Sequence, residues 1–394
     1  MLTHIALLAA LAPTLFAGKP FVEKEDVFPL DAKHNHASSI VYLPNGELFV
    51  CWYRGSGERT ADDVQIMAAR KPKGARTWTA PFVLADQPEF PDTNPTLFLD
   101  RNNRLWLFWQ TIVANQWETA ITNYRAAADY GKAGVPRWEH AGILLVKPAQ
   151  IAERTAEFAA KFKGTPYEGY AAKKAEQAKD KYFSRMGWMT RAHPVQLASG
   201  RILVPLYSDG FSFSLVAISD DNGLTWRGST PIVGGGNVQP TFAVKKDGTV
   251  VAYMRDNGPP PKRLHISLSR DNGETWTPAE DTLIPNSGTG VEVMNLKDGR
   301  WLMINNDTEK GRHSLALTIS DDEGKTWKWK RHLELDTRAE RPGSFHYPSI
   351  VQAPDGTIHA SYSVFLNHLP EGQPRKTIRH AHFNLAWVEQ GDPQ

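Results

Sequence analysis

The fold is indicated most directly by residues 219–226, which read Ser-Asp-Asp-Asn-Gly-Leu-Thr-Trp. The same pattern, S-x-D-x-G-x-T-W, returns as SRDNGETW at 269–276 and as SDDEGKTW at 320–327, and weaker copies end at Trp78 and Trp138. In such a turn the aspartate can accept backbone N–H bonds, the glycine supplies an unusual φ, and the tryptophan can fill the space between neighbouring sheets. We therefore predict a structural turn that recurs in several similar units.

Six further short turns are each followed by an apolar strand. They lie at Asn45-Gly46, Asn102-Asn103, Ser199-Gly200, Asp247-Gly248, Asp298-Gly299 and Asp355-Gly356, at spacings of 57, 97, 48, 51 and 57 residues. A period of about 50 residues with several strands per unit is typical of propeller blades, and the one long interval indicates an insertion. The prediction is an all-β, six-bladed β-propeller at 30–390. Helical spacing of apolar residues predicts a helical insertion at about 148–185.

Composition narrows the classes of partner. The net charge of the 394-residue chain is +2, which is too small to indicate a nucleic acid or a membrane as partner. The single cysteine, Cys51, lies in an apolar strand and cannot form an intramolecular disulfide. We interpret it as a small buried hydrophobic residue.

The N-terminus is typical of a secretory signal peptide. Residues 5–17 are almost wholly apolar and are followed by Gly18-Lys19-Pro20, so we predict a signal peptide at 1–18. The positive residues that usually precede the apolar stretch are missing, and a buried N-terminal strand or an uncleaved lipid-facing segment is the alternative. No later stretch reaches about 18 consecutive apolar residues. We expect a periplasmic or secreted protein that is not membrane-bound once the signal is removed.

The repeated turns resemble the Asp boxes of the sialidase superfamily of six-bladed propellers. The chain is most similar to the bacterial branch of predicted neuraminidases with BNR repeats, over about residues 32–388. The resemblance implies a glycoside hydrolase that needs no cofactor or metal and takes an acidic glycan as substrate. Its activity would be the removal of a terminal acidic sugar, either sialic acid or a related 2-keto acid or uronate-type sugar.

The alternation of turns in an up-and-down blade predicts which end of the propeller carries chemistry. The six short turns and the Asp boxes share one face, so the other face holds the residues just before each first strand and just after each second strand. Convergent polar groups in a concave site are the usual active-site hypothesis. Polar residues at those positions are His36, Arg54, Asp62, Asp63, Gln239, Arg255, Asn306, Asp307, Arg312 and Tyr347.

The resemblance assigns roles to several of these residues. Arg255 and Arg312 match two of the three arginines that clamp the substrate carboxylate, a bidentate role that suits the planar guanidinium. His36 stands where the first clamp arginine is expected. Asp63, with Asp62 beside it, matches the catalytic acid/base, a role that would need a raised pKa.

The same resemblance makes Tyr347 the nucleophile or a stabiliser of the oxocarbenium ion, an exception to the two-carboxylate rule of most glycosidases. Gln239 occupies the place of the glutamate that activates this tyrosine, and an amide cannot accept the proton. His346 or Arg255 could assist instead.

Other residues of the predicted face have less definite roles. Arg54 and Asn306 are further candidates for substrate binding, and a metal held by His34 and His36 would lack an obvious third ligand. Three more residues are candidates to line the pocket, namely Trp188, His193 and Glu292.

Two other classes of function fit the same residues. One is a propeller polysaccharide lyase or a rhamnosidase-like enzyme that uses His36, Tyr347 and the arginines. The other is a glycan-binding propeller without catalysis, which the missing glutamate favours. Since a fold does not determine its chemistry, the sequence leaves these alternatives open.

Overall fold

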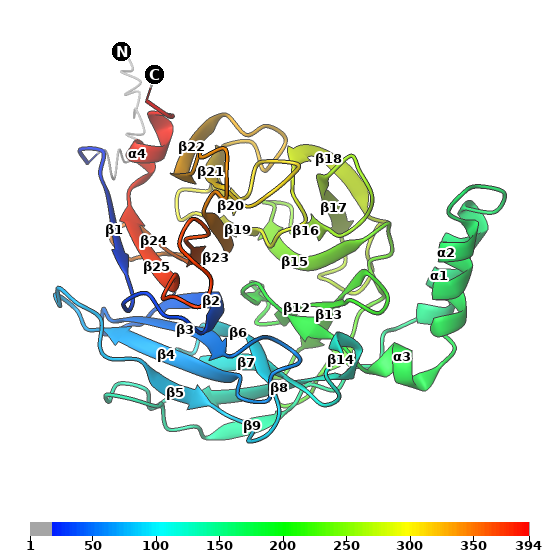
Figure 1. Ribbon diagram of the computed structural model, residues 1–394. Helices are drawn as coiled ribbons and strands as arrows, with labels where there is room; N and C mark the ends of the chain where they lie inside the picture. Colours follow the sequence, from blue (N-terminus) through cyan, green and yellow to red (C-terminus); the bar gives the residue numbers. More distant parts are fainter. Residues whose placement is uncertain (1–17, 394) are drawn as a thin grey trace, which may run out of the picture.

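The protein is a ring of six antiparallel sheets around one axis, as the computed structural model shows (Figure 1). The structure describes residues 18–393, so the predicted signal peptide lies almost wholly outside the described residues. The first strands of neighbouring blades contact each other around the axis, as β2 does with β6 and with β23. The predicted six-bladed β-propeller is therefore confirmed.

The first three blades follow one another in chain order. Blade 1 contains β2 (His34–Tyr42), β3 (Leu48–Gly55), β4 (Gln65–Lys71) and β5 (Phe82–Ala85). Blade 2 contains β6 (Asp92–Leu99), β7 (Leu105–Ile112), β8 (Ala120–Ala127) and β9 (His140–Ile143), with the short 3-10 helix η1 (Trp117–Thr119) before β8. Blade 3 has a divided first strand and contains β10 (Met189–Thr190), β11 (Val195–Gln196), β12 (Ile202–Ser208), β13 (Phe213–Ser219) and β14 (Arg227–Gly228).

The remaining blades complete the ring. Blade 4 contains β15 (Asn237–Val244), β16 (Val250–Asp256), β17 (Arg263–Ser269) and β18 (Glu280–Pro285). Blade 5 contains β19 (Glu292–Asn295), β20 (Trp301–Asn305), β21 (Ser314–Ser320) and β22 (Trp329–Leu335). Blade 6 contains β23 (Ser344–Gln352), β24 (Ile358–Phe365), β25 (Lys376–Phe383) and, as its outer strand, β1 (Val22–Asp26). The propeller therefore begins before residue 30, the boundary predicted from the sequence.

The helices lie outside the ring. The predicted insertion forms α1 (Ile151–Lys161), α2 (Glu168–Gln177) and α3 (Lys181–Arg185), and α4 (Leu385–Glu389) follows the last strand. Helix α1 buries Ile151 and Phe158, and the Phe158 ring packs edge-on against Phe213 of blade 3 at 5.5 Å between centroids. Among residues 18–393, no helix is both long enough and apolar enough to cross a membrane.

The three S-x-D-x-G-x-T-W turns share one hydrogen-bond pattern. In blade 4 the Asp271 carboxylate accepts from the Ser269 hydroxyl at 2.8 Å and from the Thr275 amide at 3.0 Å. The aspartates of the other two turns make the same contacts. Each carboxylate thus satisfies polar groups of its own turn, which confirms the structural interpretation of the motif.

The tryptophans of two of these turns reach back to the preceding blade. Trp226 packs edge-on against Trp106 at 6.3 Å between centroids, and Trp327 packs in the same way against Tyr253 at 5.9 Å. Gly223 has a φ of +82°, and a Cβ at this position would lie 2.2 Å from the Trp106 ring. Only glycine allows both the backbone conformation and the close approach.

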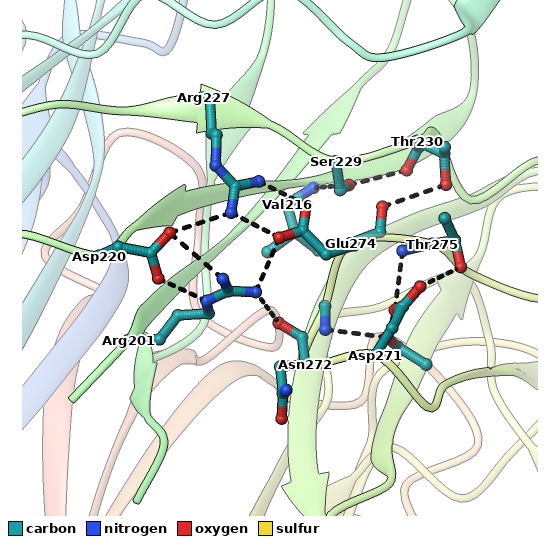
Figure 2. Close-up of polar contacts among 12 residues, drawn as sticks. Arg201, Val216, Asp220, Arg227, Ser229, Thr230, Asp271, Asn272, Glu274 and Thr275 are labelled. Carbon is teal, nitrogen blue, oxygen red and sulfur yellow. Dashed lines mark hydrogen bonds and ion pairs between the residues drawn. The ribbon is translucent and has the colours of Figure 1, made fainter. Parts of the chain in front are cut away.

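Ion pairs between blades 3 and 4 reinforce these turns (Figure 2). Arg201 contacts Asp220 at 2.6 Å and Glu274 at 2.9 Å, and Arg227 contacts the same two carboxylates. All four side chains are partly exposed, so each pair contributes little free energy by itself. Together they fix the orientation of one blade against the next, as expected for the structural face.

We expect Asp271→Ala to lower the free energy of unfolding by about 1–3 kcal/mol, because the turn loses charge-assisted hydrogen bonds. Burial raises the pKa of Asp271, but the hydrogen bonds from Thr275 outweigh this effect and lower the pKa below its usual value. The difference between variant and wild type should therefore be full above pH about 4 and shrink as the pH falls below it. Urea denaturation measures both effects, with the exposed neighbour Arg270→Ala as control. Equal stability of D271A and R270A at pH 7 would contradict the structural role.

Candidate active site

The first strands of four blades carry the same backbone irregularity at the axis. Ala37, Asn94, Gln239 and Tyr347 have φ values of 53°, 45°, 54° and 50°. Each lies at a shift of strand register, nine residues before the second residue of the following short turn. Positive φ is uncommon outside glycine and occurs preferentially at functional sites. These bulges place side chains from separate blades close to one another.

Tyr347 is the centre of this group. Its hydroxyl oxygen accepts a hydrogen bond from Nη1 of Arg255 at 3.0 Å and from Nε2 of Gln239 at 3.3 Å. The Arg312 guanidinium lies 5.8 Å from the centroid of its ring, and the His36 ring meets it edge-on at 4.5 Å. The structure thus brings together five of the nine residues predicted for the site, from blades 1, 4, 5 and 6.

A third arginine completes the group. The Arg191 guanidinium lies 4.9 Å from the centroid of the Tyr347 ring, and its Nη2 donates to the carbonyl of Pro348 at 2.8 Å. In the described part of the chain, the hydrogen bonds of Arg191 and Arg255 go only to neutral groups, and the Nε of each is buried without a partner. The carboxylates of Glu292 and Asp209 act on Arg191 and Arg255 without forming an ion pair with them, and a buried charge without a paired counter-charge is costly. The arrangement therefore favours an anionic ligand.

His36 does not supply the charge of the arginine that it replaces. Burial, followed by the neighbouring His346, lowers the pKa of His36 well below its usual range, so the imidazole is neutral. Its Nδ1 lies 3.0 Å from the Ser363 hydroxyl and 3.2 Å from Nδ1 of His346. His36 can act as a neutral hydrogen-bond donor or as a wall for Tyr347, while Arg191 provides the third positive charge.

Gln239 belongs to a network of neutral polar groups. It is buried, its Oε1 accepts from Arg255 at 3.4 Å, and its Nε2 donates to Tyr347. The hydroxyl of Tyr207 accepts from the Asn94 amide at 3.2 Å next to this pair. The amide thus orients the tyrosine and the arginine, but it cannot take a proton from either.

Asp63 lies apart from these residues. Its carboxylate accepts from Nζ of Lys33 at 2.8 Å and from the amide of Ser56 at 2.8 Å, and its side chain is 42% exposed. The hydrogen bond from Lys33 lowers the pKa of Asp63 below its usual range. The raised pKa expected from the sequence is therefore wrong, because a loop lysine that the motif does not reveal stabilises the charged form. Asp62, the adjacent residue, is exposed.

Arg54 and Asn306 also point elsewhere. Nε of Arg54 pairs with Asp31 at 2.6 Å, and both residues line a separate cavity of about 270 Å³. Asn306 is fully buried and donates to the carbonyl of Phe345 at 2.7 Å, just before the strand position of Tyr347. Asn306 therefore fixes backbone next to the site, and Arg54 holds its own loop.

The sequence interpretation missed two residues that stand among the central group. Arg191 lies nine residues before Gly200. Gln239 and Tyr347 lie at the same distance before Gly248 and Gly356, so this spacing would have identified Arg191 as well. Asp209 is partly exposed, and burial raises its pKa while the positive charge of Arg255 opposes the shift. Asp209 comes directly after β12, the second strand of blade 3. Arg255 lies at the corresponding end of β16, the second strand of blade 4, so both residues belong to the predicted face.

A cluster of His34, His36 and Glu58 supplies the third ligand that a metal at the two histidines would need. Its ligand atoms lie within 4.8 Å of one another. However, Nζ of Lys376 lies 3.3 Å from Nδ1 of His34, and an ammonium group can only donate. The His34 proton must then sit on Nε2, which faces Glu58 at 3.0 Å. That tautomer and the nearby cations favour a hydrogen-bonded pair over a cation site.

The three remaining candidates, Trp188, His193 and Glu292, lie outside the group around Tyr347. Glu292 is buried and accepts from Nδ1 of His193 at 2.7 Å and from the amide of Ile350 at 2.7 Å, while Nε2 of His193 faces the carbonyl of Ile40 at 3.0 Å. This pair joins blades 1, 3, 5 and 6. Trp188 stacks on Phe211 in the core of blade 3. These residues support the axis rather than line the site around Tyr347.

Comparison with known proteins gives consistent results. The BNR repeat-like domain family matches residues 46–154 and 167–360. A sialidase of Micromonospora viridifaciens is 26% identical over 45% of this chain and 26% of that protein, and a sialidase of Bacteroides fragilis is 23% identical over 70% of this chain and 50% of that protein. The chain thus spans a quarter to a half of the length of these relatives.

A solved structure shares the fold. The leech intramolecular trans-sialidase superposes with a TM-score of 0.68 at 14% identity, over 93% of this chain and 71% of that chain. The repeats, the ring of blades and these matches lead to one conclusion. The chain belongs to the BNR repeat-like domain family, within the sialidase superfamily of β-propellers.

Proposed function

We propose that the protein is an exported glycoside hydrolase that removes a terminal acidic sugar from a glycan. The observation that carries this proposal is the Tyr347 hydroxyl group, which accepts from Arg255 while Arg191 and Arg312 lie against its ring. A nucleophilic oxygen and an anion-binding group meet at one point of the axis. A 2-keto acid sugar such as sialic acid carries its carboxylate directly on the anomeric carbon, so it fits both features.

The arginines would bind the carboxylate of the sugar. Arg255 and Arg312 come from neighbouring blades, and a planar guanidinium pairs with a carboxylate through two parallel hydrogen bonds. The relatives named sialidases support sialic acid as the sugar, and the leech enzyme was solved with 2,7-anhydro-Neu5Ac. Another 2-keto acid sugar or a uronate-type sugar presents the same charge.

Tyr347 would act as the nucleophile. Two N–H donors at its oxygen, one of them charged, stabilise negative charge there. Since Gln239 cannot take the phenolic proton, this proton would pass to water before the attack. The oxygen would then bond to the anomeric carbon as the glycosidic bond breaks, and a water molecule would release the sugar in a second step.

We infer that Asp209 is the proton donor to the leaving oxygen. A general acid must hold its proton near neutral pH, and burial raises the pKa of Asp209 in this direction. Its carboxyl group is partly exposed and lies near Arg255. Asp63, which has a lowered pKa and two partners of its own, lacks these properties.

A second candidate function is binding of an acidic glycan without turnover. Gln239 favours it, because an amide in the place of a general base leaves Tyr347 without a proton acceptor. Both functions require the arginines, and only hydrolysis requires Tyr347 and Asp209 to react. Turnover therefore separates the two.

The first test is activity on 3′-sialyllactose with analysis of the products. We expect release of lactose, and we expect Arg255→Ala to lower kcat/KM by about 100-fold or more, since one charged donor to the carboxylate and to the tyrosine is lost. Liquid chromatography with mass spectrometry quantifies the products. Arg101→Ala, an exposed arginine on the opposite face, is the matched control.

Each other result has a definite meaning. An unsaturated, ultraviolet-absorbing product from a uronate-containing polysaccharide would indicate a lyase. A 2,7-anhydro sugar would indicate intramolecular transfer instead of hydrolysis. Full activity of R255A on an acidic substrate would contradict the carboxylate clamp. Binding without turnover of any acidic glycoside would favour the second candidate.

The second test concerns the proton donor. Because Asp209 must be protonated to act and its pKa is raised, kcat/KM should fall as the pH rises through that pKa, and this basic limb should disappear in Asp209→Asn. We expect the variant to lose about 100-fold in kcat/KM on 3′-sialyllactose. On an aryl glycoside with an acidic leaving group, the loss of kcat/KM in D209N should be far smaller, because such a leaving group needs little protonation. If Asp63→Asn shows this pattern and D209N does not, the assignment to Asp209 is wrong.

Export is a separate part of the proposal and is supported by the apolar residues 5–17. When the full chain is produced in a Gram-negative host, we expect it in the periplasm or medium with a mature N-terminus at residue 18 or 19. N-terminal sequencing of the purified protein gives this boundary. Recovery from the cytoplasm with Met1 or Leu2 at the N-terminus would contradict export.

A further inference from the structure

A cavity of about 580 Å³ lies between the helical insertion and blade 4. One wall is aromatic and comes from α1, α2 and the turn between them, with the side chains of Phe158, Phe162, Tyr167 and Tyr170. The opposite wall comes from the loop at 256–261 after β16, together with Asp281. The insertion, whose role the sequence did not reveal, therefore forms half of a pocket.

This pocket adjoins the candidate active site. Nη2 of Arg255 lies 3.5 Å from Oδ1 of Asn257, and Asn257 lines the pocket. Ser212, on the other side, also lines it and belongs to the same short loop as Asp209. The lining of the pocket thus includes a contact of Arg255, the arginine proposed to bind the carboxylate, and a residue of the loop that carries Asp209, the proposed proton donor.

The aromatic wall is fixed to the propeller. Phe158 packs against Phe213 of blade 3, and Nζ of Lys174 in α2 donates to the carbonyl of Gly210. Tyr170 of α2 and Ser212 of the loop between β12 and β13 line the same pocket. A wall held at both helices is preorganised, which lowers the cost of binding a ligand against it.

The lining has the chemistry of a site for neutral sugars. Aromatic faces pack against the C–H faces of pyranose rings, and the oxygens of Asp281 and Asn257 can accept from sugar hydroxyl groups. Nδ1 of His265 holds Asp281 at 2.9 Å, which fixes its orientation. No lysine or arginine lines the pocket, and its two carboxylates disfavour an anion. The axial group around Tyr347 has the opposite charge.

We propose that this pocket is a subsite for the neutral sugars to which the terminal acidic sugar is linked. The inference rests on the proposed function and deepens it: the substrate is an oligosaccharide with an acidic end and a neutral remainder. The arginines take the acidic end, and the insertion takes the next sugars. Tyr167, which is 48% exposed at the pocket wall, is the residue whose loss should weaken this contact without disturbing the core.

The test compares Tyr167→Ala with Tyr182→Ala, which removes an exposed tyrosine of α3 outside the pocket. Substrates are 3′-sialyllactose and the methyl glycoside of the same acidic sugar, which has no sugar to occupy the pocket. We expect Y167A to lower kcat/KM for 3′-sialyllactose by about five- to tenfold, mainly through KM, and to leave the methyl glycoside unchanged. Y182A should behave as wild type on both. Equal losses on both substrates, or no loss on either, would overturn the subsite.

A binding experiment separates this proposal from the proposed function. Saturation-transfer NMR with lactose, the neutral part of the substrate, needs no catalysis. If the wild-type protein hydrolyses neither substrate, the proposed function fails, but lactose binding by wild type and Y182A and its loss in Y167A would still support the subsite. Lack of lactose binding by wild type at millimolar concentration, or equal binding by Y167A, would overturn it.

Discussion

The pairing of β1 with β25 is the contact on which the candidate site depends. It runs from Val22 opposite Phe383 to Asp26 opposite Arg379 and closes the ring by joining the start of the described chain to its last strand. His36 and Tyr347 belong to blades 1 and 6, far apart in sequence, and meet at 4.5 Å only in a closed ring. Since each blade buries its faces against two neighbours, opening one seam would expose apolar surface and separate these two side chains.

Arginine side chains have different partners at the two ends of the propeller. At the turn face, Arg201 and Arg227 both pair with carboxylates at the surface. At the other face, Arg191 and Arg255 bind only neutral groups in the described part of the chain. The rigid blades hold these guanidinium groups without a direct ion pair, and the charges of Glu292 near Arg191 and Asp209 near Arg255 offset only part of the cost. An anion at the axis would complete the pairing that the protein leaves open, which explains why the arrangement suits an acidic ligand.

The sequence predicts the features of the fold that repeat from blade to blade. It does not predict properties of a single residue, such as its pKa, that depend on one tertiary contact. The spacing of the Gly turns predicted the blades, and the position nine residues before each turn selected Gln239 and Tyr347. The same spacing before the Ser199-Gly200 turn leads to Arg191, which the selection of candidates left out. Asp63 was chosen by its place in a loop, but Lys33, thirty residues earlier, determines its charge. The raised pKa of Asp209 arises from burial, which no local pattern of residues reveals.

The helical insertion is attached to the loop that carries Asp209, the proposed proton donor. Nζ of Lys174 donates to the carbonyl of Gly210, and Gly210 belongs with Asp209 to the loop that joins β12 to β13. The insertion therefore does two things with one set of contacts: it supplies the aromatic wall of the pocket, and it holds the loop that carries the proposed acid. A sugar bound against this wall, as proposed, would lie next to the segment that carries Asp209. In the proposed subsite, contacts with the neutral part of the substrate would add to those of the acidic end and would therefore act mainly on KM.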